Sequence, residues 1–385
     1  MKFTVDHSLA GSFARTGTLD TAHGRVVTPA FMPVGTMGAV KTLAPWELEE
    51  LGSEIILGNT YHLHLRPGEN VIQKTGGLQK WTGWNKPILT DSGGYQAFSL
   101  GKTKANMAKT TDRGVQFYSH LDGKKLFFTP ESVIDIQLKL GSDIVMVLDD
   151  CAPYPSTTAR LQEGVARTGE WAKKSVDYWQ QIHNLDLKAC PSGKICGKAL
   201  FGIVQGGTEK SLRQQSLNDI QSLPFDGIAI GGVSVGEGKE NMLSAVDFIS
   251  SDLDRNRPHY LMGVGEPTDL INMVYRGIDM FDCVLPTRLA RHGSFWTSAD
   301  FRRYDISLSE FTNDSKPLDP NCKCKFCQKF SRSYLRHLYV SGEILALRAL
   351  TYHNLWLVNR LMDDLRTAIQ DGSYEARFAS FLRGA

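Results

Sequence analysis

The chain has 385 residues, of which 42% are hydrophobic and 22% charged, a composition typical of globular proteins. No apolar run approaches the roughly 20 residues that a membrane-spanning helix needs, and the N-terminus has no signal-peptide pattern, so we expect a cytoplasmic protein with no membrane partner. A net charge of only +2 gives no sign of a protein that binds nucleic acid through its overall charge.

Short apolar runs recur along the chain, most of them ending in Gly, Asp or Asn. Continuous apolar runs of this length are typical of parallel strands that are buried on both faces. The runs span residues 29–35, 54–59, 87–91, 143–149, 200–205, 227–232, 260–265 and 280–284.

Helical patterns lie between many of these runs, at residues 44–52, 130–140, 158–183, 209–222, 239–250 and 267–276. Eight strands that alternate with helices predict an α/β protein with a (β/α)8 barrel of the TIM type. A doubly wound open sheet is the alternative, but no G-x-G-x-x-G follows the first strand. In a barrel, catalytic groups sit at the C-terminal ends of the strands.

Residues 304–350 depart from this rhythm and predict a zinc-binding subdomain inserted after the eighth strand. Cys322, Cys324 and Cys327 stand within six residues, and either His337 or His353 follows as a fourth ligand. A Cys₃His set fills the tetrahedral shell of Zn²⁺, which would make the ion structural. Free thiols or an iron–sulfur site are the alternatives, and the latter usually takes four cysteines.

We therefore divide the chain into a barrel domain (1–303), a zinc-binding subdomain (304–350) and a C-terminal helical segment that packs on the barrel (351–385). Residues 344–370 have the pattern of a helix that returns to the barrel. Residues 187–198, with two cysteines, look like an insertion before the fifth strand.

Two aspartates, Asp91 and Asp282, each close an apolar strand, where a charge adds nothing to the core. A pair of carboxylates at a barrel mouth can act as nucleophile and general acid/base, as in glycoside hydrolysis. In the structural alternative, Asp91 caps the following turn and Asp282 pairs with Arg288.

A second set of residues suits the recognition of a flat heterocycle. Asp149 can accept two hydrogen bonds from a guanine-like edge, and Gln205 can both donate and accept. Glycines at 231 and 232 allow the backbone to approach the ring, while Tyr95 and Met262 could enclose it.

Basic residues mixed with aromatic ones follow the eighth strand and continue through the cysteine segment. This mixture suits a phosphate backbone and unstacked bases, although an ordinary solvated surface explains it equally well. The set comprises Arg288, Arg291, Arg302, Arg303, Lys323, Lys325, Lys329, Arg332 and Arg336, with Phe295, Trp296 and Tyr304 among them.

Five motifs in this order resemble bacterial-type tRNA-guanine transglycosylase (queuine tRNA-ribosyltransferase) over essentially the whole chain. They are DSGGYQ at 91–96, VQGG at 204–207, LMGVG at 261–265, DCVLPTR at 282–288 and CKCKFC at 322–327. NTYHL at 59–63 also resembles this family.

The resemblance implies a zinc-bearing barrel enzyme, a pentosyltransferase of queuosine biosynthesis. It exchanges the wobble guanine of G-U-N anticodons, those of the tRNAs for Asp, Asn, His and Tyr, for a 7-deazaguanine base. By similarity, Asp282 is the nucleophile and Asp91 the general acid/base, and two displacements give retention.

The resemblance also assigns the remaining site residues. Base-binding residues are Asp149, Gln205, Gly232, Tyr95, Met262 and Val233; RNA-binding residues are Arg288, Arg291 and Thr287; zinc ligands are Cys322, Cys324, Cys327 and His353. His353 is thereby preferred over His337. Family members act as homodimers, so we expect one here.

Some positions depart from the family pattern. Asp150 stands where bacterial members commonly have Glu, Leu289, Ala290 and His292 replace more usual residues of the arginine loop, and Glu266 occupies a position that is often Lys. These differences concern contacts to tRNA rather than the chemistry.

Val235 bears on the incoming base, because queuine-using members tend to carry something smaller there. A branched side chain should exclude queuine, so we predict the smaller pre-queuosine-1 base (preQ1) as substrate. The same reaction with queuine is the alternative.

Two other functions are alternatives to base exchange in tRNA. A metal-dependent amidohydrolase would use His62 and His64 with Asp282, but the middle strands lack the further histidines it needs. A non-catalytic tRNA-binding subunit should lack the two aspartates, and both are present.

Overall fold

The computed structural model describes residues 1–96, 108–189 and 197–383. Eight parallel strands form a closed barrel in the order β10-β11-β12-β13-β14-β4-β5-β6, which confirms the predicted fold. In chain order these strands are β4 (Ala30–Gly35), β5 (Ile56–Gly58), β6 (Ile88–Thr90), β10 (Ile144–Met146), β11 (Ala199–Val204), β12 (Gly227–Ile230), β13 (His259–Leu261) and β14 (Met280–Cys283).

The barrel strands are apolar because both of their faces are buried. All six residues of β11 and all six of β4 are buried. Closure comes from the pairing of β14 with β4, in which Met280 lies opposite Ala30 and Phe281 opposite Phe31. Each of the eight predicted runs overlaps one of these strands.

The six predicted helices are all present around the barrel. They are α1 (Pro45–Glu50), α6 (Pro130–Leu140), α7 (Thr158–Ala189), α8 (Lys210–Gln221), α9 (Lys239–Ser250) and α10 (Pro267–Tyr275). Local signals fix their ends: Thr129 caps α6 through the Ser132 N–H, Pro130 follows it, and Gly141 ends the helix at a φ of 88°. α7 extends beyond the predicted residue 183.

Two three-stranded antiparallel sheets lie outside the barrel, and the sequence did not indicate them. One consists of β1 (Lys2–Ser8), β2 (Arg15–Thr21) and β3 (Gly24–Thr28), the other of β7 (Ala108–Thr111), β8 (Gly114–Tyr118) and β9 (Lys125–Phe128). Three short helices also follow β5: α2 (Thr60–Leu65), α3 (Glu69–Lys74) and α4 (Leu78–Thr82). Because the strands of the two outer sheets have an exposed face, they contain no continuous apolar run that would have predicted them.

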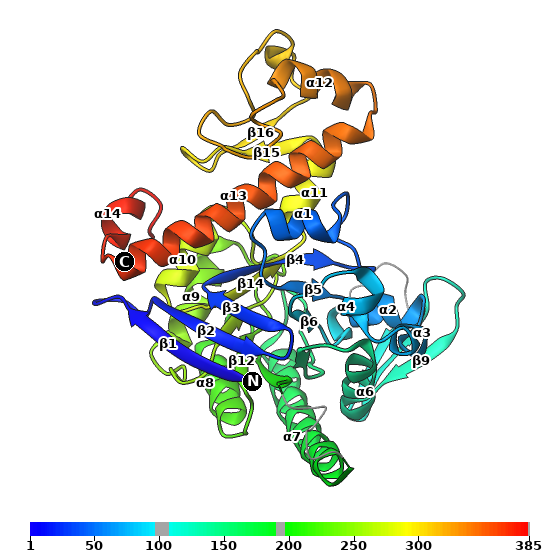
Figure 1. Ribbon diagram of the computed structural model, residues 1–385. Coiled ribbons are helices and arrows are strands. Elements are labelled where there is room, and N and C mark those ends of the chain that lie inside the picture. Colours follow the sequence, from blue (N-terminus) through cyan, green and yellow to red (C-terminus); the bar gives the residue numbers. More distant parts are fainter. Residues whose placement is uncertain (97–107, 190–196, 384–385) are drawn as a thin grey trace.

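The segment after β14 extends away from the barrel (Figure 1). It contains α11 (Leu285–Arg291), β15 (Ser294–Trp296), β16 (Arg303–Asp305), the 3₁₀ turn η1 (Ser309–Phe311) and α12 (Arg332–Val340). α13 (Ile344–Gln370) then runs back along the barrel to α14 (Tyr374–Phe378), as the pattern at 344–370 predicted.

The domain division stays a proposal. Residues 303 and 304 both lie in β16, and residues 350 and 351 both lie in the continuous helix α13. The 187–198 insertion falls largely on residues 190–196, outside the described part. Within the described ranges, no helix has both the length and the apolar character needed to cross a membrane.

Candidate active site and metal centre

Asp91 follows β6 directly and is held by the turn that follows β5. Its Oδ2 accepts a hydrogen bond of 2.6 Å from Asn59 Nδ2 and one of 2.9 Å from Gln96 Nε2, while its Oδ1 accepts the Thr60 N–H at 2.9 Å. Asn59 caps α2 through its Oδ1, which turns its amide nitrogen toward Asp91. The carboxyl group is therefore fixed in orientation.

The environment of Asp91 suits proton transfer near neutral pH. Burial and, to a smaller extent, the nearby Asp282 carboxyl raise the pKa of Asp91 to about 7, against the hydrogen bond from the Thr60 N–H. A carboxyl group with this pKa can both give and take a proton at pH 7.

Asp282 lies on β14, at the same mouth of the barrel. Its Oδ1 accepts the Tyr260 hydroxyl at 2.6 Å and the Gly263 N–H at 2.9 Å. Oδ2 accepts no hydrogen bond from any described residue. Burial raises the pKa of Asp282, and the bonds from Tyr260 and Gly263 oppose that rise. One oxygen is thus anchored while the other keeps its lone pairs for reaction.

Tyr260 on β13 is hydrogen-bonded to Asp282 and lies within electrostatic reach of Asp91. It is fully buried, and burial followed by Asp282 and then Asp91 raises the pKa of its hydroxyl well above the ordinary value. The hydroxyl therefore stays protonated and remains a hydrogen-bond donor to Asp282.

The predicted base-reading residues come together on the neighbouring strands. Gln205 Nε2 donates to Asp149 Oδ2 at 2.7 Å, and both side chains are buried. Burial raises the pKa of Asp149 to about 7, against this hydrogen bond. A Cβ atom at Gly232 would lie 2.4 Å from Gln205 Oε1, so the backbone of this glycine packs closely against Gln205.

The residues predicted to enclose the base differ in exposure. Val233 is buried, Met262 is half-buried, and 47% of the Tyr95 surface is exposed. Burial raises the pKa of Tyr95, Cys151 raises it further, and Arg288 lowers it. Tyr95 therefore lies within electrostatic reach of both Cys151 and Arg288.

The three predicted RNA-binding residues lie on α11. Arg288 is exposed and Arg291 half-buried. Burial, followed by the neighbouring Arg288, lowers the pKa of Arg291. Thr287 is buried, and its hydroxyl donates to the Val284 carbonyl at 3.1 Å within the same turn.

Asp150, one of the departures from the family pattern, is turned toward α7. One of its carboxylate oxygens accepts from Arg160 at 2.5 Å and the other from Arg167. Glu266, another departure, forms an ion pair with Arg303 and accepts the Trp296 indole N–H at 3.3 Å. Both carboxylates are engaged in structural contacts.

The residues predicted as zinc ligands form one buried group. The ligand atoms of Cys322, Cys324, Cys327 and His353 all lie within 4.8 Å of one another. His353 Nε2 lies 2.8 Å from the Trp296 carbonyl, which leaves Nδ1, 3.3 Å from Cys327 Sγ, to face the thiols. A carbonyl on the distal nitrogen is the usual arrangement for a metal-binding histidine. The group could hold a metal ion; the alternative His337 is exposed.

His62 and His64 lie on α2 and do not converge on Asp282. His64 pairs with Glu69 at 2.7 Å, and the His62 ring contacts the ring of His120. In the described ranges, the Cys₃His group alone brings together three or more residues that could bind a metal.

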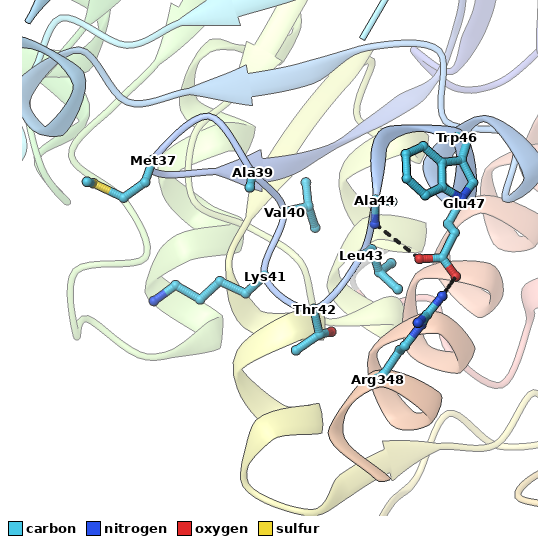
Figure 2. A pocket seen from close by; sticks show the side chains of 10 residues that line it. All are labelled: Met37, Ala39, Val40, Lys41, Thr42, Leu43, Ala44, Trp46, Glu47 and Arg348. Carbon is cyan, nitrogen blue, oxygen red and sulfur yellow. Dashed lines mark hydrogen bonds and ion pairs between the residues drawn. The ribbon is translucent and has the colours of Figure 1, made fainter. Parts of the chain in front are cut away.

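A cavity of about 480 Å³ lies apart from these residues (Figure 2). The loop after β4 and the start of α1 form most of its wall, and Arg348 of α13 closes it through a 2.7 Å contact with Glu47. No residue predicted for catalysis or recognition lines it.

Sequence reasoning missed four contributors to this site. Asn59 and Thr60 stand in one of the motifs and Tyr260 in one of the apolar runs, but none of the three was expected to hold a carboxyl group. The fourth is Arg213, on α8, which binds the loops after β11 and β12 through backbone carbonyls. A signal for Arg213 existed, because it falls on the buried stripe of α8 with Leu217 and Ile220.

A closed (β/α)8 barrel with two carboxyl groups at its mouth and a buried Cys₃His group defines a barrel enzyme of glycosyl transfer. Residues 10–385 match the family model described as Queuine tRNA-ribosyltransferase. The chain belongs to this family, and is a pentosyltransferase of tRNA-guanine exchange in the queuosine pathway.

Similar proteins cover nearly the whole chain. A Queuine tRNA-ribosyltransferase of Caldanaerobacter subterraneus subsp. tengcongensis is 48% identical over 371 residues, which is 96% of this chain and 94% of that protein. The enzyme of the same name from Dictyoglomus turgidum is 48% identical over 369 residues, 96% of this chain and 91% of its own length. That of Francisella tularensis subsp. novicida is 49% identical over 368 residues, with shares of 96% and 94%.

Proposed function

We propose that this enzyme replaces the wobble guanine of G-U-N anticodons with preQ1 through a covalent enzyme–RNA intermediate. The observation that carries the proposal is the contrast between the two carboxyl groups. Asp282 has one oxygen held by two donors and one that accepts no hydrogen bond from the described residues, and the nearby Asp91 has a pKa of about 7.

In the first displacement, Asp282 Oδ2 attacks C1′ of the ribose. The C1′–N9 bond breaks, its electron pair goes to guanine, and protonated Asp91 supplies the proton. The Tyr260 hydroxyl and the Gly263 N–H hold the other oxygen of Asp282, so that the free oxygen is aimed by fixed donors.

In the second displacement, the incoming base loses its N9 proton to the Asp91 carboxylate. N9 attacks C1′, the ester bond to Asp282 breaks, and its electron pair returns to Asp282. Two inversions at C1′ give net retention, as in a retaining glycosidase.

Recognition of the base is assigned to Asp149, Gln205 and the Gly232 backbone. An ionised Asp149 would accept the N1–H and 2-amino hydrogens of guanine, and the Gln205 amide bonded to it fixes its orientation. Tyr95, Met262 and Val233 would enclose the ring. A Cβ atom at Gly232 would collide with Gln205, which explains why this position has no side chain.

For the RNA partner, we propose that Arg288 and Arg291 contact the uridines on either side of the wobble base. Arg288 is exposed and Arg291 half-buried on the short helix after Asp282. Thr287 is kept as a prediction for this set, although its hydroxyl already donates to Val284. The tRNAs for Asp, Asn, His and Tyr carry the required anticodons. The homodimer and the cytoplasmic location also remain proposals.

We propose Zn²⁺ as the metal of the Cys₃His group. Three buried thiols and one imidazole within 4.8 Å of one another suit a borderline-soft tetrahedral ion. Bound there, zinc would crosslink the cysteine segment to α13. Four protein ligands leave no position for water or substrate, so no chemical step involves the metal.

The choice of preQ1 depends on Val235. Val235 is half-buried, and its N–H donates to Glu237 Oε2 at 2.8 Å, so its loop is tethered. Queuine carries a bulky cyclopentenediol on the aminomethyl group. Overpacking against a tethered wall costs roughly 1–3 kcal/mol, or about ten- to hundredfold in preference.

The test is exchange on an unmodified G-U-N anticodon stem-loop. Radiolabelled guanine should be incorporated, and preQ1 should outcompete queuine in the same tube. No guanine exchange would refute the function. Equal or better use of queuine would refute only the preQ1 assignment, and would favour the salvage reaction.

A further inference from the structure

Arg213 is an arginine in an unusual place. Its side chain is completely buried on α8, and in the described ranges it pairs with no carboxylate. Burial lowers the pKa of Arg213 to about 10, which still leaves the guanidinium charged at neutral pH. A buried charge without an ionic partner needs other compensation.

That compensation comes from backbone carbonyls of the two base-reading loops. Nε donates to the Gly207 carbonyl at 2.7 Å, Nη1 to the Gly231 carbonyl at 2.7 Å, and Nη2 to the Gly232 carbonyl at 3.0 Å. A longer contact of 3.4 Å joins Nη1 to the Val204 carbonyl. One side chain thus binds the loop after β11 and the loop after β12 together.

The direction of these carbonyls fixes the direction of the N–H groups beside them. In a trans peptide, the C=O and the following N–H point to opposite sides. Since the Gly231 and Gly232 carbonyls face Arg213, the N–H groups of Gly232 and Val233 face away from it. Burial raises the pKa of Cys151 to about 12, and the nearby Gly232 N–H opposes that rise, so this N–H lies on the side of the Cys151 thiol.

The helix that carries Arg213 holds the same loops at two more points. Ser216 Oγ accepts the Gln205 N–H at 2.9 Å. Gly206, at a φ of 122°, lies so close to α8 that a Cβ atom would be 2.7 Å from the Arg213 backbone nitrogen. α8 therefore determines how Gln205 and Gly232 are presented.

We propose that Arg213 is a positioning residue that sets the hydrogen-bonding polarity of the base pocket. By holding the carbonyls of both loops, it leaves N–H donors for the 6-oxo oxygen of a purine or 7-deazapurine base. The inference rests on the proposed function. It adds the residue that turns backbone N–H groups toward the base, so that this wall of the pocket donates hydrogen bonds.

The experiment compares Arg213→Met and Arg213→Lys with the wild type in equilibrium competition binding of three bases. Guanine is the reference. 6-Thioguanine keeps N1–H and the 2-amino group but has sulfur, a poorer acceptor, at position 6. Hypoxanthine keeps the 6-oxo group but lacks the 2-amino group, which Asp149 is proposed to read.

Arg213→Met should weaken guanine binding at least about tenfold, the order expected for one lost hydrogen bond. It should reduce the preference for guanine over 6-thioguanine by a similar factor. The preference for guanine over hypoxanthine should persist, as should tRNA affinity. Arg213→Lys keeps the charge without the fork and should fall between.

The matched control is Arg276→Met. Arg276 is also buried, at the C-terminal cap of α10, but it binds Asp247 and the Arg383 carbonyl instead of the loops after β11 and β12. It should lose stability without any change in base preference. If Arg213→Met does not fold, the preference of Arg213→Lys for guanine over 6-thioguanine is the measurement that tests the proposal.

The proposal is overturned if the folded Arg213 variant keeps the wild-type preference for guanine over 6-thioguanine while only its melting temperature falls, as in Arg276→Met. A wild-type protein that binds no guanine would instead overturn the proposed function, and this inference with it.

Discussion

At the scale of single residues, the two carboxyl groups differ in the hydrogen bonds they accept, and their substitutions should differ accordingly. Asp282→Ala should abolish base exchange, at least about 10³-fold, together with the denaturation-resistant protein–RNA adduct. Gel analysis after denaturation measures the adduct. A covalent adduct that survives in Asp282→Ala would rule out Asp282 as the nucleophile.

Asp91→Asn should keep the nucleophile and lose the group that gives a proton to the leaving guanine and takes one from the incoming base. We therefore expect both half-reactions to slow by about 10²–10⁴-fold, while the covalent adduct can still form slowly. Single-turnover measurement of each half-reaction, with gel analysis of the adduct, tests this. A half-reaction that keeps the wild-type rate would contradict the proton-transfer role of Asp91.

The pKa of Asp91 also predicts how stability depends on pH. Burial raises this pKa from 3.8 to about 7, so the folded protein holds the proton more tightly than the unfolded chain. The stability contributed by this group is complete below pH 3.8 and is lost as the pH rises to about 7. Asn does not titrate, so the stability of Asp91→Asn relative to wild type should grow from pH 4 to pH 7 and then level off.

Chemical denaturation at several pH values measures this difference. Asp122→Asn is the control, because hydrogen bonding from Ser119 lowers the pKa of the exposed Asp122 and reverses the sign. A stability difference between Asp91→Asn and wild type that stays constant with pH would show that the pKa of Asp91 is not raised in the folded protein.

At the scale of elements, the metal group joins the cysteine segment to α13. Cys324→Ser should lower bound zinc and the midpoint of thermal unfolding, and tRNA binding should fail with the fold. His337→Ala, at the exposed histidine nearby, should leave zinc content unchanged. A Cys324→Ser protein that lost zinc, stayed folded and lost only the chemical step would contradict a structural role.

Asn354, next to His353 on α13, connects the metal group to the arginine helix. Its Nδ2 donates to the carbonyls of Pro286 and Ser294, and its Oδ1 accepts the Trp296 N–H. Asn354→Ala leaves these buried groups without their hydrogen-bond partner and should lower the free energy of unfolding by about 1–3 kcal/mol.

Because Pro286 precedes Arg288 in α11, Asn354→Ala should also raise KM for tRNA more than it changes kcat. Asn313→Ala, at an exposed position, is the control. Wild-type stability in Asn354→Ala would mean that these contacts contribute little.

At the scale of the whole molecule, the sequence predicted the parts that are buried on both sides. β11 and β12 are unbroken apolar runs, so their positions, and hence the ends that carry Gln205 and Gly232, could be read directly. The outer sheet of β1, β2 and β3 could not, because six of the seven residues of β1 are exposed and carry no core pattern. Exposed strands are specified by their partners instead of by their own composition.

The candidate site was predictable in its ligands but not in its supports. Asp91 and Asp282 stand at strand ends, which is visible in a sequence. That Tyr260 would aim Asp282, or that Thr287 would turn inward, depends on the rotation of a strand and a helix about their axes. A barrel fixes that rotation only when it closes, through contacts between distant segments such as β14 and β4.

That closure has a consequence for the order of events during synthesis. β4 emerges from the ribosome early and must wait with an unpaired edge until β14 has been made. The three thiols likewise emerge before His353, so the metal group lacks its last ligand until the first part of α13 has been translated. Ribosome-bound chains that stop before β14 should therefore present open strand edges and be the forms most exposed to aggregation, whereas chains that stop between Cys327 and His353 should present unprotected thiols and be the forms most exposed to oxidation.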